Sequence, residues 1–190
     1  MRLVVAITGA SGAILGIRFL ELLQSLGIET HLIISKWGQR TIIDETSYSL
    51  TQVKGLANSC YDDDDLSAPP ASGSFHADGM AIIPCSMKTL AKVACGLEDT
   101  LIARAADVTI KEGRRLALVV REAPLSAIHL ENMLKLARLG VTIFPPVPAF
   151  YLKPQSLDEM IQNVVKRVAA VFDRGASSQA ALEPGHPTEG

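Results

Sequence analysis

The chain has 190 residues, of which 48% are hydrophobic and 20% charged, and its formal net charge is −2. This length fits one domain with a sizeable core, and the lack of a long basic run argues against nucleic-acid binding. The three cysteines form no C-x-x-C pair, which predicts reduced thiols in a cytoplasmic protein rather than disulfides or a zinc site. The uncharged stretch 3–17 is too short to span a membrane and is interrupted by glycines, so no membrane partner is expected.

The first element is an apolar run over residues 2–7, which is typical of a strand covered on both faces in a parallel sheet. A turn containing Gly9 and Gly12 follows, and then a helix over 13–26 that ends at Gly27. The glycines let the backbone approach a ligand, and the free N–H groups at the helix start favour a phosphate there. An ordinary strand–turn–helix joint is the alternative.

The second strand is predicted over 29–34 and ends at Ser35, where a dinucleotide fold usually has an acidic residue. This weakens NAD as the ligand and leaves a mononucleotide such as FMN open. A short helix is expected over 37–45, and His31 is expected to be structural. Residues 46–79 show little regularity and predict a long loop. Its four aspartates at 62–65 are expected to be solvated, since four adjacent carboxylates cannot all point at one metal ion.

The strand predicted over 80–84 repeats the arrangement of the first, with a hydroxyl-rich turn at its end and a helix after it. A helix over 98–107 leads through a loop to the strand 116–120, which ends in Arg121 and Glu122. These two side chains are expected either to line the ligand-binding edge of the sheet or to form an ion pair with each other.

The remaining elements complete an alternation of five strands with helices. They are a helix over 126–138, a strand over 141–144, a proline-rich connector over 145–151, and a helix to about 173 that opens with a capping box at Ser156 and Glu159. The alternation predicts an α/β fold with one doubly wound parallel sheet, Rossmann-like, over residues 1–173. Residues 174–190 are expected to be a disordered tail.

Four motifs, in their order and spacing, resemble the UbiX-type flavin prenyltransferases, formerly called aromatic-acid decarboxylases. They are Thr8–Gly12, Pro84–Thr89, Val120–Pro124 and Pro145–Tyr151. The resemblance implies a flavodoxin-like fold in an FMN-binding domain and a homo-oligomer, typically a dodecamer. It also implies that reduced FMN and dimethylallyl phosphate are joined, without a metal, to give prenylated FMN for a UbiD-type decarboxylase.

The resemblance further assigns roles to individual positions. Flavin binding falls to Gly9, Ala10, Ser11, Ser35, Ser86, Met87, Lys88, Thr89 and Arg121. Binding of dimethylallyl phosphate falls to Lys111, Arg121, Glu122, Tyr151 and Arg167. Proton handling falls to Ser11, Glu45 and Glu122, and Arg104 matches a basic residue near the site.

The chemistry of prenyl transfer fits these residue types. Cationic and hydroxyl donors stabilise the charge that grows on a leaving phosphate, and a cluster of them can take the place of a metal. Loss of the ring proton needs a base, for which Glu45 and Glu122 are both open. Trp37 and Phe150 can shelter a prenyl cation from water, with core packing as the alternative for each.

Three other functions compete with prenyl transfer. An FMN-dependent cysteine decarboxylase of the related fold needs an Asn-containing turn, which 85–89 lacks, and a catalytic histidine, for which only His76 is loosely placed. A nicotinamide reductase needs a Tyr-x-x-x-Lys pair, and none of the three tyrosines has a lysine four residues on. A non-catalytic flavin-binding module would share the loops but not depend on Arg121, Tyr151 or Arg167.

Overall fold

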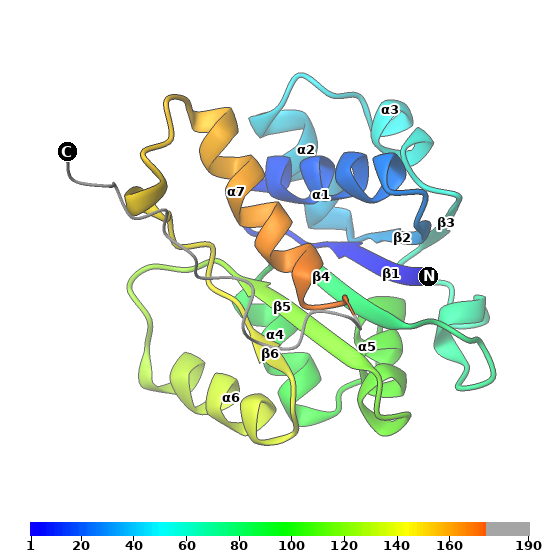
Figure 1. Cartoon of the computed structure of the whole chain (residues 1–190). Coiled ribbons are helices and arrows are strands. Elements are labelled where there is room, and N and C mark those ends of the chain that lie inside the picture. The colour runs from blue at the N-terminus through cyan, green and yellow to red at the C-terminus, as the bar shows by residue number, and fades with distance from the viewer. Residues whose placement is uncertain (174–190) are drawn as a thin grey trace.

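The computed structural model describes residues 1–173, which form one parallel six-stranded sheet in the order β3-β2-β1-β4-β5-β6, with helices on both faces (Figure 1). The strands are β1 (Arg2–Ile7), β2 (Glu29–Ile34), β3 (Ser59–Asp62), β4 (Gly79–Cys85), β5 (Arg115–Val120) and β6 (Thr142–Ile143). The predicted α/β fold with a doubly wound parallel sheet is confirmed. The tail predicted over 174–190 lies outside the described residues.

The core has two parts because strand side chains alternate between the faces of the sheet. Leu3 and Val5 of β1 pack on one face, and Val4 and Ala6 pack on the other. The first face is covered mainly by α1 and α7, and the second by α4, α5 and α6. The helices are α1 (Ala13–Ser25), α2 (Lys36–Glu45), α3 (Leu50–Gly55), α4 (Met87–Cys95), α5 (Leu101–Lys111), α6 (Ala127–Arg138) and α7 (Leu157–Ala170). Within residues 1–173, no helix is long and apolar enough to cross a membrane.

The expectation of a long loop over 46–79, and of five strands, is wrong. The segment contains α3 and β3, so the sheet has six strands. Ser49 opens α3 with a capping box, in which its hydroxyl accepts from Gln52 N and the Gln52 side chain accepts from Ser49 N. β3 is an edge strand whose residues alternate between exposed and half-buried, so it lacks the apolar run that marks the central strands.

Three further boundaries differ from the prediction. The helix expected over 98–107 begins after the cap Thr100 and continues to Lys111, which places that lysine in a helical turn rather than a loop. The last strand is two residues long, and α7 ends at Ala170. The predicted capping box is half formed: Ser156 Oγ accepts from Glu159 N at 3.1 Å, while the Glu159 carboxylate accepts from Gln155 N.

Two glycines bring helix starts against the carboxyl edge of the sheet. A Cβ on Gly16 would lie 2.5 Å from Ile83 O, and a Cβ on Gly38 would lie 2.4 Å from Ile7 O. Real Cβ atoms do not approach so closely, so any other residue at these positions would push α1 or α2 away from the strand ends. The loops after β1, β2 and β4 are thereby held together at one edge.

Candidate functional site

The loop after β1 is closed by a carboxylate of this chain. Gly12, in the left-handed conformation at φ 100°, precedes α1 and has no side chain to cap it. Glu45, the last residue of α2, fills that role, since its Oε2 accepts from Gly12 N at 2.8 Å and from Ala13 N at 3.3 Å. A carboxylate is stable at a helix N-terminus. Two of the N–H groups that were expected to be free for a phosphate, those of Gly12 and Ala13, are therefore occupied by this carboxylate.

The loop after β4 is capped from within and carries positive charge. Ser86 Oγ accepts from Thr89 N at 3.3 Å and lies 3.1 Å from Thr89 Oγ1, so Ser86 caps α4. The first turn of α4 has no acidic residue and presents the exposed Lys88. A helix N-terminus with a lysine and hydroxyls around it is suited to an anion such as a phosphate.

A cavity of about 370 Å³ joins the loops after β1, β2 and β4. Its polar lining includes Gly9, Ser35, Lys36, Ser86, Lys88 and Thr89. Ser35 caps α2, since its Oγ accepts from Gly38 N at 3.0 Å. Among residues 1–173, neither Lys36 nor Lys88 forms an ion pair, so both ammonium groups are available to a bound anion. The structure thus brings together five of the nine predicted flavin-binding residues in one cationic hollow.

Acidic residues limit this cavity on one side. Asp63 lines it, and its Oδ1 accepts from Ile102 N at 2.9 Å, which ties the loop after β3 to α5. Burial raises the pKa of Asp63, while its neighbours in the aspartate run are exposed as predicted. Lys92 pairs with Asp99 at 2.6 Å. Within the described part of the chain, no group of three His, Cys, Asp or Glu side chains could hold a metal ion.

A second hollow, of about 280 Å³, lies beside the first loop and is mostly apolar. Ser11 and Arg121 supply its polar lining, and α7 and the proline-rich connector supply much of the remainder, including Pro146, Pro148, Leu157, Met160, Ile161 and Val164. Arg121 N donates to Cys85 O at 3.2 Å, which fixes the start of the loop after β5 against β4. Ser11, Ser86 and Arg121 therefore lie on neighbouring loops at one edge, as the sequence predicts.

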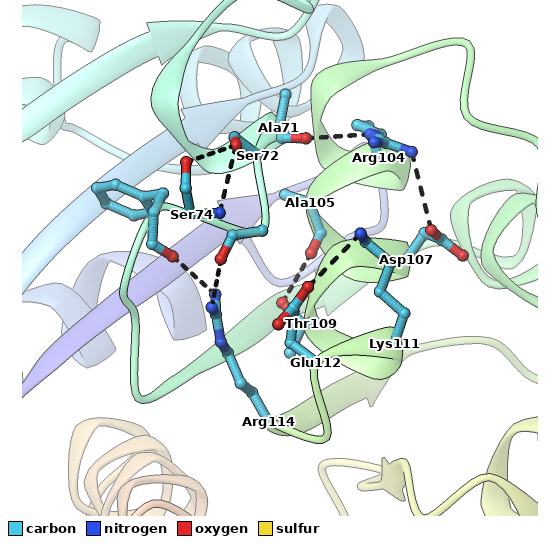
Figure 2. Close-up of polar contacts among 12 residues, drawn as sticks. Ala71, Ser72, Ser74, Arg104, Ala105, Asp107, Thr109, Lys111, Glu112 and Arg114 are labelled. Atoms are coloured by element: carbon cyan, nitrogen blue, oxygen red, sulfur yellow. Dashed lines mark hydrogen bonds and ion pairs between the residues drawn. The ribbon is translucent and has the colours of Figure 1, made fainter.

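Four of the five predicted donor-binding residues line neither of these two hollows: Lys111, Glu122, Tyr151 and Arg167. Tyr151 lies on the turn 150–152 and is 67% exposed, and the Arg167 guanidinium lies over the Phe144 ring at 5.5 Å. Lys111 ends α5 at the opposite edge of the sheet, just before β5, where its Nζ lies 3.5 Å from Glu112 (Figure 2). Within one chain, Lys111 does not meet the flavin-binding loops.

Arg104 and Glu122 have local partners. Arg104 pairs with Glu98 and, at 3.9 Å, with Asp107, and its Nε donates to Ala71 O (Figure 2). The Glu122 carboxylate accepts from Ala123 N at 2.9 Å. In the region described, Glu122 makes no ion pair with Arg121, so the predicted alternative of mutual pairing is not observed.

The sequence analysis gave no site role to four polar residues that line the cationic cavity, Lys36, Asp63, Lys92 and Thr100, and it left two aromatic positions undecided. The signal that could have found Lys36 and Asp63 is their place at strand ends: Asp63 directly follows β3, and Lys36 is the second residue after β2. Trp37 and Phe150 are 66% and 72% exposed, so core packing within one chain does not explain either.

Comparisons of this chain with known sequences and structures agree on one family. The model of the Flavoprotein family matches residues 1–172. The chain is 56% identical over 171 residues to the mitochondrial flavin prenyltransferase PAD1 of Saccharomyces cerevisiae, a match that covers 90% of this chain and 71% of that protein. The crystal structure of AnUbiX (PadA1) in complex with FMN and dimethylallyl pyrophosphate superposes with a TM-score of 0.89 at 54% identity, covering 90% of this chain and 91% of that one.

Two further structures bear on assembly and on the alternatives. The dodecameric FMN-dependent UbiX-like decarboxylase from Escherichia coli O157:H7 has a TM-score of 0.89 at 52% identity, over 90% of this chain and 94% of that one. The FMN-dependent cysteine decarboxylase TvaF has a TM-score of 0.64 at 15% identity, over 89% of this chain and 98% of that one. At that identity the likeness extends to the fold alone.

Proposed function

This chain belongs to the UbiX-type flavin prenyltransferases of the Flavoprotein family, and we propose that it joins the dimethylallyl group of dimethylallyl phosphate to N5 and C6 of reduced FMN. The observation that carries the proposal is the pair of hollows at one sheet edge. One is cationic and contains Lys88, and the other is apolar and contains Ser11 and Arg121. A phosphorylated flavin and an apolar prenyl group need these two environments side by side.

The flavin phosphate fits the cationic cavity after β4. Ser35, Ser86 and Thr89 bring hydroxyl groups to it, and Lys88 brings an unpaired ammonium group. The β1 loop is closed to a second anion by Glu45, which leaves that loop to contact the uncharged part of the nucleotide. Ser11 and Arg121 are placed to contact the ring system and the incoming donor together, because they line the same hollow.

The prenyl donor binds in the apolar hollow against α7. Its phosphate needs cationic partners that stabilise the leaving group, and among residues 1–173 Arg121 is the cationic side chain that lines this hollow. Tyr151 and Arg167 are exposed, and Lys111 lies at the far edge of the sheet. We therefore propose that neighbouring protomers of a homo-oligomer, a dodecamer as in the E. coli O157:H7 relative, bring these groups to one another's sites.

Proton transfer is assigned to Ser11, Glu45 and Glu122. Glu45 is oriented by two backbone N–H groups next to Ser11, so a proton can pass between them over a short path. Glu122 is exposed at the end of β5 and, beside Arg121, is placed to accept or return the proton of the donor phosphate. Both roles are part of the proposal.

Three features of the setting also belong to the proposal. The reaction proceeds without a metal, the product serves a UbiD-type decarboxylase, and the protein acts in the cytoplasm. A reducing compartment agrees with the free thiols at Cys60, Cys85 and Cys95. Turnover that is unchanged by a chelator would support metal independence, and turnover that returns only on addition of a divalent ion would contradict it.

The test is a mass spectrum of the flavin after anaerobic incubation with reduced FMN and dimethylallyl phosphate. We expect the flavin to gain one five-carbon unit, and a flavin of unchanged mass would contradict the proposal. A parallel sample with dimethylallyl pyrophosphate shows whether the longer donor is accepted. Glu122→Gln should bind FMN normally and lose product by about a hundredfold or more, because a positioned acid–base group contributes about 10²–10⁴ in rate. Wild-type turnover in that variant would remove Glu122 from the mechanism.

A further inference from the structure

Thr8 is a buried polar residue between the loops after β1 and β4, and the proposed reaction gives it no role. It directly follows β1 and is 1% exposed. Its hydroxyl donates to Pro84 O at 2.8 Å and accepts from Ser86 N at 2.8 Å. Both hydrogen-bonding functions of the hydroxyl are thus satisfied within the protein. One side chain connects the loop after β1 to the first residue of the loop after β4.

The backbone alone leaves this connection open. β1 and β4 are paired from Leu3 to Ala6, and beyond that point Thr8 N donates to Pro84 O at 3.2 Å. Pro84 has no N–H to return to β1. The Thr8 hydroxyl is the acceptor for the N–H group of Ser86, two residues after Pro84. Without it, a half-buried donor at the start of the α4 loop would lose this partner.

We infer that Thr8 is a positioning residue for FMN, whose hydroxyl holds the phosphate-binding turn in register with the β1 loop. The identity of the ligand rests on the proposed function. Ser86 caps α4, and the N–H groups and Lys88 of the first helical turn move with it. Gly9 of the β1 loop lines the same cavity as Ser86. A displacement of Ser86 relative to Gly9 changes the fit of the phosphate, while Ser11 and the apolar hollow beside α7 keep their geometry.

The experiment compares Thr8→Val, which keeps the shape and removes the hydroxyl, with Thr8→Ser, which keeps the hydroxyl. FMN and riboflavin affinities are measured by quenching of flavin fluorescence. We expect Thr8→Val to bind FMN about tenfold more weakly, with a smaller loss for riboflavin, since the lost hydrogen bond lies on the phosphate side. KM for FMN should rise while kcat at saturating FMN stays within about twofold, because Thr8 contacts no reacting atom. Thr8→Ser should restore the FMN affinity.

The matched control is Thr30→Val. Thr30 is also 1% exposed, but it lies at the start of β2 and its hydroxyl contacts Asn58 at 3.4 Å, far from the loops. This variant should keep the wild-type preference for FMN over riboflavin. If Thr8→Val does not fold, Thr8→Cys takes its place. Its thiol forms weaker hydrogen bonds than a hydroxyl, so this variant should also lose FMN affinity, by less than about tenfold.

Several results would overturn the inference. They are an unchanged FMN affinity in the folded variant that lacks the hydroxyl, an equal loss in Thr30→Val, a failure of Thr8→Ser to restore binding, or an equal loss for FMN and riboflavin. Binding is measured without the prenyl donor, so these outcomes are independent of turnover. Failure of the wild-type protein to bind FMN at all would instead contradict the proposed function.

Discussion

The turns after β1 and β4 occupy equivalent places in the fold, yet the structure prepares them for different parts of a nucleotide. Both follow buried central strands, contain small or hydroxyl residues and open a helix. At α1 the helix start is covered by the Glu45 carboxylate, and at α4 it is capped by Ser86 and flanked by Lys88. The first turn is therefore negative at its helix start and the second is positive.

This difference shows that a helix N-terminus after a glycine-containing turn does not by itself identify a phosphate site. The decisive feature is which group satisfies the free N–H donors. Glu45 lies 33 residues from Gly12 in the chain, so only the folded structure shows that the donors are taken. Three substitutions and one labelling experiment would break or sharpen the contrast between the two turns.

The largest effect is expected from Gly9→Ala. A Cβ at this position would lie 2.4 Å from Cβ of Trp37, so the β1 loop and α2 must separate. We expect about 1–3 kcal/mol of destabilisation by urea unfolding and more than tenfold weaker binding of both FMN and riboflavin. Gly55→Ala is the control, because a Cβ there meets nothing within 4 Å. Wild-type flavin affinity in Gly9→Ala would show that the β1 loop does not touch the flavin.

A selective effect is expected from Lys88→Ala. Loss of one ammonium group from the phosphate cavity should weaken FMN binding by about tenfold and leave riboflavin binding unchanged. The FMN effect should shrink as salt is added, because the lysine is exposed. Lys54→Ala, at an exposed lysine of α3, is the control. An equal loss for both flavins would mean that the phosphate does not bind beside α4.

A smaller change in stability is expected from Glu45→Ala. It removes the carboxylate that caps α1, and lost caps cost about 0.5–2 kcal/mol. Urea unfolding at fixed protein concentration measures the free energy. Glu131→Ala, at an exposed glutamate of α6, is the comparison and should be nearly neutral. Equal stability of both variants would show that Glu45 contributes nothing as a cap.

The smallest effect concerns Cys85, at the carboxyl end of β4. Burial raises the pKa of its thiol to about 12, so the neutral form prevails at every lower pH. We expect iodoacetamide to modify the exposed Cys60 and Cys95 while Cys85 stays unmodified in the native protein up to pH 9 or so. Peptide mass mapping measures this. Rapid modification of Cys85 at neutral pH would show that the β4 loop opens readily.

The sequence predicted the central part of the sheet well, because β1, β2, β4 and β5 are apolar on both faces. It missed β3, whose residues alternate at the sheet edge, and extended β6 beyond its two residues. The positions of Ser11, Ser35 and Ser86 were predictable, since the carboxyl ends of parallel strands meet at one edge.

Other features of the site depend on contacts that no local pattern records. The capping of α1 by Glu45 joins two helices distant in sequence. The link from Thr8 to Ser86 joins residues 78 positions apart.

The most direct test of the contrast is a crystal structure of this protein with FMN. We expect the phosphate beside Ser86, Thr89 and Lys88, with Glu45 still accepting from Gly12 N and Ala13 N. A phosphate bound to those two N–H groups at the start of α1, with the Glu45 side chain displaced, would contradict it.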